Sequence, residues 1–108
     1  MIRKATRNDV NWLVKVEDAS FNTDKISRKN FRYLLSRANA ETIVDDESGV
    51  IRGYALLLFH SGTSLARLYS IAVHPGYRGL DIGENLLASV YTIPEEVLLP
   101  QKSVFQSR

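Results

Sequence analysis

The stretch formed by residues 68–87 limits the fold of this chain more than any other part of the sequence. Its apolar first third, residues 68–73, predicts a β-strand that Pro75 and Gly76 bring to an end. A glycine-containing turn, residues 78–83, leads into a helix whose first N–H groups lack intrahelical partners and whose dipole favours negative charge. This order predicts an anion site. Close packing of the strand and the helix would explain the same glycines, so both interpretations stay open at this point.

The rest of the chain predicts one α+β domain in which helices cover both faces of a sheet (an α/β/α arrangement). The expected elements are, in order, a strand at 2–5, a helix at 8–19, a helix capped by Ser27, strands at 42–45, 50–59 and 65–73, and the helix described above. Turn residues at 46–49 and 61–64 separate the three strands, which predicts an antiparallel meander. Continuous apolar sequence at 54–59 is typical of a central strand. Residues 95–99 could add one more short strand.

The composition predicts a single globular domain. The chain has 108 residues, of which 44% are apolar and 24% charged, enough for a modest core. We expect residues 1–92 to form this domain and residues 93–108 to be a short, partly flexible segment. The lack of cysteine excludes disulfides, thiolate catalysis and cysteine metal ligands. His60 and His74 show no ligand spacing, so no metal is expected.

Charge and hydropathy narrow the functional classes. A net charge of +2 is too small to argue for nucleic acid. The basic helix face formed by Arg28, Lys29, Arg32 and Arg37 is more simply solvated than bound to an acidic protein or RNA. No apolar run approaches about 18 residues, and the N-terminus lacks a signal-peptide region. We therefore expect a cytoplasmic protein without a membrane-spanning segment.

The stretch of residues 68–87 resembles motif A of the GNAT superfamily of N-acetyltransferases. The residues that carry this resemblance are Ile71, Ala72, Val73, Pro75, Tyr77, Arg78, Gly79, Gly83, Leu86 and Leu87. Upstream, residues 2–6 with Asp9, residues 16–21 with Ser27 and Phe31, and the pair Gly53 and Tyr54 are also similar to the family. They resemble most the branch that acetylates the N-termini of ribosomal proteins and peptides. The resemblance covers about residues 1–90.

The resemblance implies that the chain binds acetyl-CoA and transfers its acetyl group directly to a primary amine. The acceptor would be a peptide or protein N-terminus, a lysine or a small amine. Backbone amides of the turn would hold the pyrophosphate, and the preceding strand would bind the pantetheine arm. The implied cofactor-binding residues are Ile71, Ala72, Val73, Arg78, Gly79, Leu80, Asp81, Ile82 and Gly83. The catalytic residues stay unassigned.

The sequence departs from the family pattern at two points that bear on acetyl-CoA binding and on acetyl transfer. Asp81 replaces the family's middle glycine, and a carboxylate there repels a pyrophosphate and tolerates left-handed backbone less well. The family also continues with a strand, a helix and a hairpin, whereas only 17 residues follow Tyr91 and span at most roughly 60 Å. We therefore expect a truncated member. The alternative is a non-catalytic domain that binds CoA or a protein, with a homodimer as one way to complete the sheet.

Several further residues have both a functional and a structural interpretation. Glu17 and Phe21 could line the acceptor site, but surface charge and core packing are the simpler interpretations. Tyr69 and Ser70 are interpreted as ordinary strand residues, and His74 as an exposed loop residue. None of them carries a general-base assignment.

Overall fold

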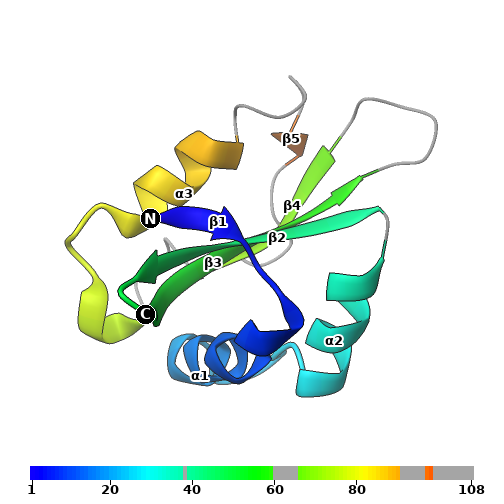
Figure 1. Cartoon of the computed structure of the whole chain (residues 1–108), viewed down its shortest axis with the longest axis horizontal. Helices are drawn as coiled ribbons and strands as arrows, with labels where there is room; N and C mark the ends of the chain where they lie inside the picture. The colour runs from blue at the N-terminus through cyan, green and yellow to red at the C-terminus, as the bar shows by residue number, and fades with distance from the viewer. Residues whose placement is uncertain (38, 60–65, 91–96, 99–108) are drawn as a thin grey trace.

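A mixed five-stranded sheet forms the centre of the molecule (Figure 1). The computed structural model describes residues 1–37, 39–59, 66–90 and 97–98. The strands, which lie side by side in chain order, are β1 (Ile2–Lys4), β2 (Ala40–Glu47), β3 (Val50–Phe59), β4 (Ala66–Val73) and β5 (Val97–Leu98). The first four are antiparallel, and β5 pairs parallel to β4. The predicted antiparallel meander is therefore confirmed, and the short strand expected near the C-terminus is present.

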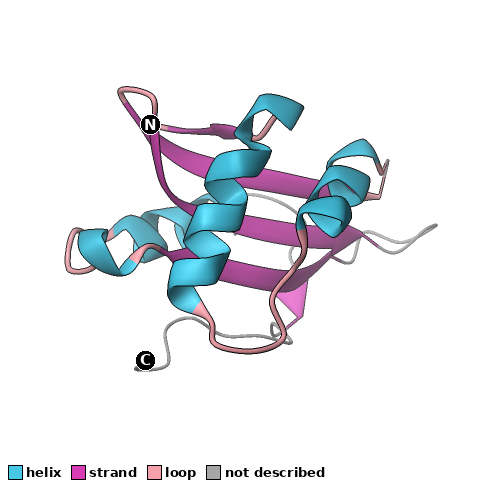
Figure 2. Cartoon of the chain, turned by 90° about the horizontal axis from the view of Figure 1, so that it is seen from below, coloured by secondary structure: helices cyan, strands magenta, loops and turns pink. Residues whose placement is uncertain are grey.

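Helices cover both faces of this sheet (Figures 1 and 2). They are the 3₁₀ helix η1 (Arg7–Asp9), α1 (Val10–Ser20), α2 (Arg28–Ser36), the 3₁₀ helix η2 (Pro75–Tyr77) and α3 (Ile82–Val90). Figure 1 shows α1 and α2 on one face and α3 on the other, which confirms the predicted α/β/α arrangement. The predicted cap of α2 is also present, since the Ser27 hydroxyl accepts from the Asn30 N–H at 3.1 Å. Within the described ranges, no helix is long and apolar enough to span a bilayer.

The core lies on both sides of β3. Residues Tyr54, Ala55, Leu56 and Leu57 are fully buried, as expected for a strand with helices on both faces. Leu13 of α1 is fully buried on one side of the sheet, and Phe31 of α2 meets the Tyr54 ring edge-on at a centroid distance of 5.6 Å. The loop expected at residues 61–64 lies outside the described residues.

Gly53 lets α3 approach the sheet closely. A Cβ atom at this position would lie 2.8 Å from the Ala72 carbonyl oxygen and 3.3 Å from side-chain atoms of both Ile82 and Leu86. A distance of 2.8 Å to a backbone atom is too short for any side chain at this position. The glycine on β3 therefore determines how closely the first turn of α3 packs beside the end of β4.

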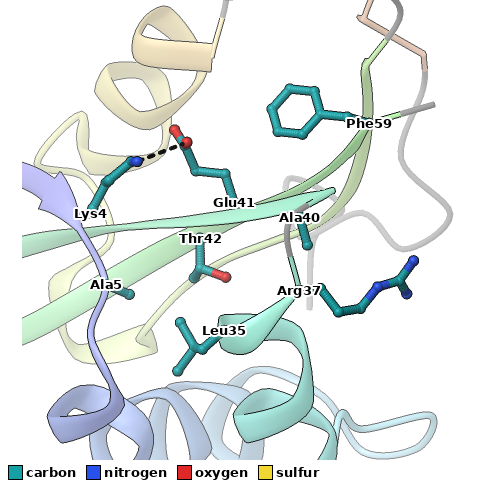
Figure 3. Close-up of a pocket in the computed structure, with 8 residues that line it drawn as sticks. All are labelled: Lys4, Ala5, Leu35, Arg37, Ala40, Glu41, Thr42 and Phe59. Atoms are coloured by element: carbon teal, nitrogen blue, oxygen red, sulfur yellow. Dashed lines mark ion pairs between the residues drawn. The ribbon is translucent and has the colours of Figure 1, made fainter. Parts of the chain in front are cut away.

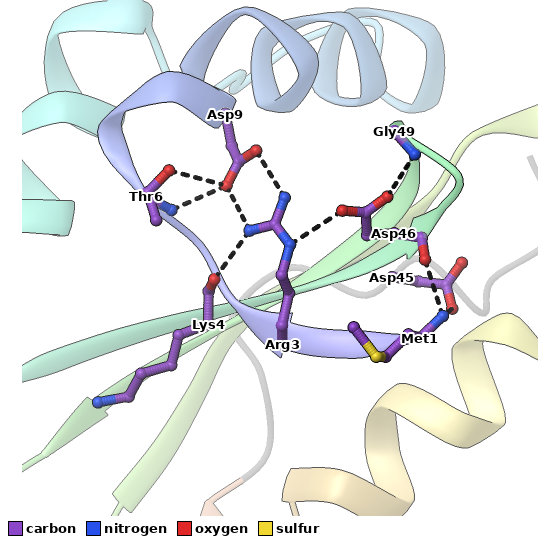
Figure 4. Close-up of polar contacts among 8 residues, drawn as sticks. All are labelled: Met1, Arg3, Lys4, Thr6, Asp9, Asp45, Asp46 and Gly49. Atoms are coloured by element: carbon purple, nitrogen blue, oxygen red, sulfur yellow. Dashed lines mark hydrogen bonds and ion pairs between the residues drawn. The ribbon is translucent and has the colours of Figure 1, made fainter.

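Arg3 joins three separate parts of the chain (Figure 4). Its guanidinium donates to both carboxylate oxygens of Asp9 at 2.8 and 3.0 Å, and its Nε donates to Asp46 at 2.9 Å. Asp46 also accepts from the Gly49 N–H at 2.8 Å in the turn between β2 and β3. The hydrogen bonds from Arg3 are the main cause that lowers the pKa of Asp9 and of Asp46. This network fixes β1 to η1 and to that turn.

Candidate functional site

The C-terminal half of β4 has one edge that no other described strand covers. On one side β4 pairs with β3 along its whole length, but β5 pairs only with Ala66 and Arg67. Leu57 lies opposite Leu68 and Leu56 opposite Ser70, so Tyr69 is an extra residue that forms a β-bulge. A bulge bends and twists its strand, and this one lies between the part of β4 that pairs with β5 and the C-terminal half of β4. The side chains of the predicted residues 71–73 are buried. The His74 N–H bonds to Arg52 of β3, so the backbone groups of Ile71 and Val73 point to the open edge, where the Val73 carbonyl accepts from the Ser20 hydroxyl at 3.3 Å.

His74 organises the turn that follows β4. Its Nδ1 accepts from the Gly76 N–H at 3.0 Å, its carbonyl accepts from Tyr77 at 2.9 Å, and its own N–H donates to Arg52 O at 2.8 Å. The side chain is half-buried and caps η2. His74 is a loop residue as interpreted from the sequence, but its side chain is half-buried and not fully exposed.

Two residues of the turn have left-handed backbone. Gly79 has φ of +87°, and a Cβ atom there would meet nothing within 4 Å. Asp81 has φ of +61°, in the region that glycine adopts at least cost. The conformation expected from the family's middle glycine is therefore present although the side chain is an aspartate. Gly79 leaves open space on its Cα side for an approaching ligand.

The turn ends at the N-terminus of α3. The first bond of this helix runs from the Asn85 N–H to the Asp81 carbonyl at 3.0 Å. The N–H groups of Ile82, Gly83 and Glu84 precede that bond, so the helix itself supplies no acceptor for them. Together with the helix dipole they form a donor set that suits a phosphate group.

Two carboxyl groups lie beside these donors. Asp81 and Glu84 are both exposed, and the side chain of Asp81 raises the pKa of Glu84, first through hydrogen bonding and then through its charge. A carboxyl pair disfavours a nearby anion. The turn therefore combines backbone donors that suit a phosphate group with side-chain carboxyl groups that disfavour one.

The structure brings the predicted cofactor residues to one end of the sheet (Figure 1). The backbone of residues 71–73 lies on the open edge of β4, and residues 78–83 link that strand to α3. Arg78, Gly79, Leu80 and Asp81 are exposed, whereas Ile82 and Gly83 are buried. Their assignment to a cofactor stays a prediction.

A buried polar network lies behind this site. The Glu17 carboxylate accepts from the Tyr54 hydroxyl at 2.6 Å and from the Ile26 N–H at 2.7 Å, and the Tyr54 hydroxyl lies 2.8 Å from Ser70 Oγ. All three side chains are fully buried. Burial, and then the charge of Glu17, raise the pKa of Tyr54. Glu17 is thus no surface charge, and that interpretation is wrong, whereas Phe21 does pack in the core.

The sequence contained a signal for the burial of Glu17. The residue lies four positions after Leu13 and seven after Val10, both buried on α1, so it occupies the core-facing stripe of the helix. Its partners lie outside α1: Tyr54 is on β3, and Ile26 is in the loop between α1 and α2. The helical position of Glu17 was visible in the sequence, but its bonding partners were not.

Comparisons with known proteins identify the family. The model of the Acetyltransferase (GNAT) family matches residues 8–97. The chain belongs to this family, which confirms the resemblance, and no curated protein gives a significant match.

Solved structures share the fold. One is the ribosomal-protein-S18-alanine N-acetyltransferase from Escherichia coli, with a TM-score of 0.76, 20% identity, and coverage of 85% of this chain and 57% of that chain. Another is the PaiA N-acetyltransferase from Thermoplasma acidophilum in complex with coenzyme A, with a TM-score of 0.75, 18% identity, and coverage of 85% and 69%. A ribosomal-protein-alanine N-acetyltransferase from Brucella melitensis has a TM-score of 0.70, 27% identity, and coverage of 85% and 65%. The chain thus spans little more than half the length of the Escherichia coli enzyme.

Proposed function

We propose that this chain is an N-acetyltransferase that binds acetyl-CoA between the open edge of β4 and the N-terminus of α3. The observation that carries the proposal is the combination of these two features in a chain that matches the GNAT family. Two structures with the same fold hold related ligands, coenzyme A in one and isobutyryl-CoA in the other.

The backbone would provide most of the binding groups. The N–H and C=O of Ile71 and the N–H of Val73, which face the open edge, would pair with the pantetheine arm as a further strand would. The N–H groups of Ile82, Gly83 and Glu84 would donate to the pyrophosphate. Gly79 allows a close approach, and the exposed Leu80 would lie beside the cofactor. Because Asp81 and Glu84 place carboxyl groups at the same turn, we expect modest affinity.

The bound thioester would supply an activated acetyl group for direct attack by an amine. A chain without cysteine has no thiol for a covalent acetyl-enzyme. No side chain of the described site is assigned as a base, so we propose water as the first acceptor of the amine proton. The fold relatives act on ribosomal-protein alanine in one case and on aminoglycosides in another. The acceptor proposed here is a primary amine of a protein N-terminus, a lysine or a small molecule, in the cytoplasm.

The second candidate is a non-catalytic domain that binds CoA or a protein. The specific observation in its favour is the carboxyl pair at the turn, which opposes the binding of a pyrophosphate. In this case the open edge of β4 would bind a protein strand, for example that of a second copy.

Calorimetric titration with acetyl-CoA, followed by an assay for thiol release, separates the two candidates. The amine panel should include an alanine-initiated peptide, a lysine peptide and an aminoglycoside. Saturable binding with amine-dependent release of CoA supports the transferase. Binding without turnover supports the second candidate, and the absence of binding at millimolar ligand contradicts the cofactor claim.

A further inference from the structure

A cavity of about 310 Å³ lies at the opposite edge of the sheet, next to the point where β1 ends (Figure 3). It is formed by the end of β1, the start of β2 and the C-terminal part of α2. In the sheet, β3 separates β2 from β4. The cavity is therefore distinct from the candidate cofactor site, and its volume is at the lower end of the range for small-molecule clefts.

Thr42 of β2 contributes an unsatisfied polar atom to this cavity. The residue is only 4% exposed, and its Oγ1 has no hydrogen-bond partner in the part of the chain that is described. Thr42 is one of the lining residues, and Figure 3 shows its hydroxyl on the side of Arg37. A buried hydroxyl without a partner costs stability. A ligand that bonds to it would recover part of that cost.

The backbone of β2 adds a donor and an acceptor at the same place. The Ala5 N–H donates to the Thr42 carbonyl at 2.8 Å, the last such bond before the chain turns into η1. Alternate residues of an antiparallel strand face the same neighbour. Ala40 is two residues before Thr42 and pairs regularly with Leu58. It therefore presents its N–H and C=O to the side that β1 has left, where no described strand continues.

The walls of the cavity combine polar and apolar side chains, and they include Arg37, whose Nε donates to Asn39 Oδ1 at 2.9 Å. Leu35 from α2 and Phe59 from β3 are half-buried and supply apolar surface. Lys4 and Glu41 lie across the rim from each other and form an ion pair at 3.5 Å, so their charges largely offset (Figure 3). A secondary amide offers the C=O and N–H that match Ala40.

We propose that this cavity binds a short extended peptide segment with an apolar side chain. The segment would extend the sheet along β2 where β1 leaves it, as in binding by strand addition. Its amides would pair with Ala40 and reach the Thr42 hydroxyl, and its apolar side chain would lie against Leu35 on the face of the sheet that α2 covers. The proposal does not depend on acetyl-CoA, and it adds a second binding site to the domain.

A titration of the ¹⁵N-labelled protein with N-acetyl-leucine methylamide tests this site without cofactor. We expect saturable shift changes at Ala40, Glu41 and Thr42 at millimolar probe. Thr42→Val keeps the shape of the side chain but removes the hydroxyl, so it should weaken binding about fivefold without lowering the melting temperature. The matched control is Thr23→Val, a change in the exposed loop between α1 and α2, which should leave binding unchanged.

A second probe, 4-methylpentanoate, has the same apolar group with a carboxylate in place of the amides. Weaker binding of this probe than of the amide supports the peptide assignment. The proposal is overturned if neither probe gives saturable changes at β2, if the carboxylate binds as tightly as the amide, or if Thr42→Val binds as well as Thr23→Val.

Discussion

Asp81 illustrates how one residue can keep a conformation while changing its electrostatics. Its φ of +61° places it in left-handed backbone, where glycine has no steric cost and aspartate has some. The turn therefore keeps its shape, while a negative charge lies next to the N–H groups of α3. Because the backbone and the charge act separately, a substitution can distinguish their effects.

Replacing Asp81 with glycine should tighten the binding of acetyl-CoA. Loss of the charge near the pyrophosphate is worth of order 1 kcal/mol, or about fivefold in Kd, and calorimetry would measure it. The matched control is Asp24→Gly in the loop before α2, where φ is +56°. Equal affinities for wild type, Asp81→Gly and Asp24→Gly would contradict the pyrophosphate assignment.

Tyr54→Phe should destabilise the protein through the buried network. It leaves Glu17 with one donor fewer and Ser70 without its phenol partner, at a cost of about 1–3 kcal/mol. Urea unfolding would measure the loss. Tyr33→Phe, at a position that is 59% exposed, should change the free energy of unfolding by less than about 0.5 kcal/mol. Similar losses in the free energy of unfolding for both variants would show that the buried network does not stabilise the protein.

At the scale of elements, the packing of α3 against the sheet sets the position of the candidate site. The helix carries the candidate phosphate donors, and Gly53 sets its distance from β3. The bulge at Tyr69 bends β4 just before the part of the strand that has an open edge. The position of α3 thus depends on Gly53, and the course of β4 depends on the bulge at Tyr69.

Gly53→Ala should weaken both the fold and the site. The new methyl group would lie 2.8 Å from Ala72 O, so β3, β4 or α3 must shift, at a cost of about 1–3 kcal/mol in the free energy of unfolding. Thermal unfolding and acetyl-CoA titration would measure the two effects. Gly76→Ala is the milder comparison, because its nearest contact is the His74 side chain at 3.3 Å. A Gly53→Ala protein as stable as Gly76→Ala would exclude the close approach.

At the scale of the whole molecule, the network of Arg3 connects the N-terminus to the rest of the sheet. The pKa of Asp9 and of Asp46 is lowered from the ordinary value of 3.8. A lowered carboxyl pKa gives stability that is present above the ordinary value and is lost as the pH falls through the folded-state pKa. The contribution of this network is therefore complete at neutral pH and disappears in strong acid.

Arg3→Gln should lower the stability at pH 7, and the difference from wild type should shrink as the pH falls to about 2. Urea unfolding across this pH range would measure it. Arg7→Gln, a change at an exposed residue of η1, serves as control and should show no such pH-dependent difference. A constant difference between wild type and Arg3→Gln at all pH values would contradict the role of the two carboxylates.

Much of the fold could be predicted because its signals are local. The strand at 50–59 was predicted with the observed bounds, and the Ser27 cap was correct, because apolar runs and capping residues act within a few positions. The first helix is only partly regular, since its predicted start forms the 3₁₀ helix η1. For the candidate site, the motif predicted which residues bind the cofactor, and this stays a prediction; it did not indicate which edge of β4 stays open.

The sequence by itself determined the order of the elements, the glycine turn before α3 and the membership of the GNAT family, because periodicity, capping and motif spacing are properties of neighbouring residues. Only the tertiary structure decided that Glu17 is buried and accepts from the Tyr54 hydroxyl, and that β5 pairs with Ala66 and Arg67 of β4. It also decided that Thr42 lines a cavity and that its hydroxyl has no hydrogen-bond partner among the described residues. These features depend on residues that are far apart in the chain and meet only when the sheet has formed. The turn before α3 was a candidate cofactor site from its sequence, and the register of β4 and the packing of α3 decided which backbone groups lie beside it.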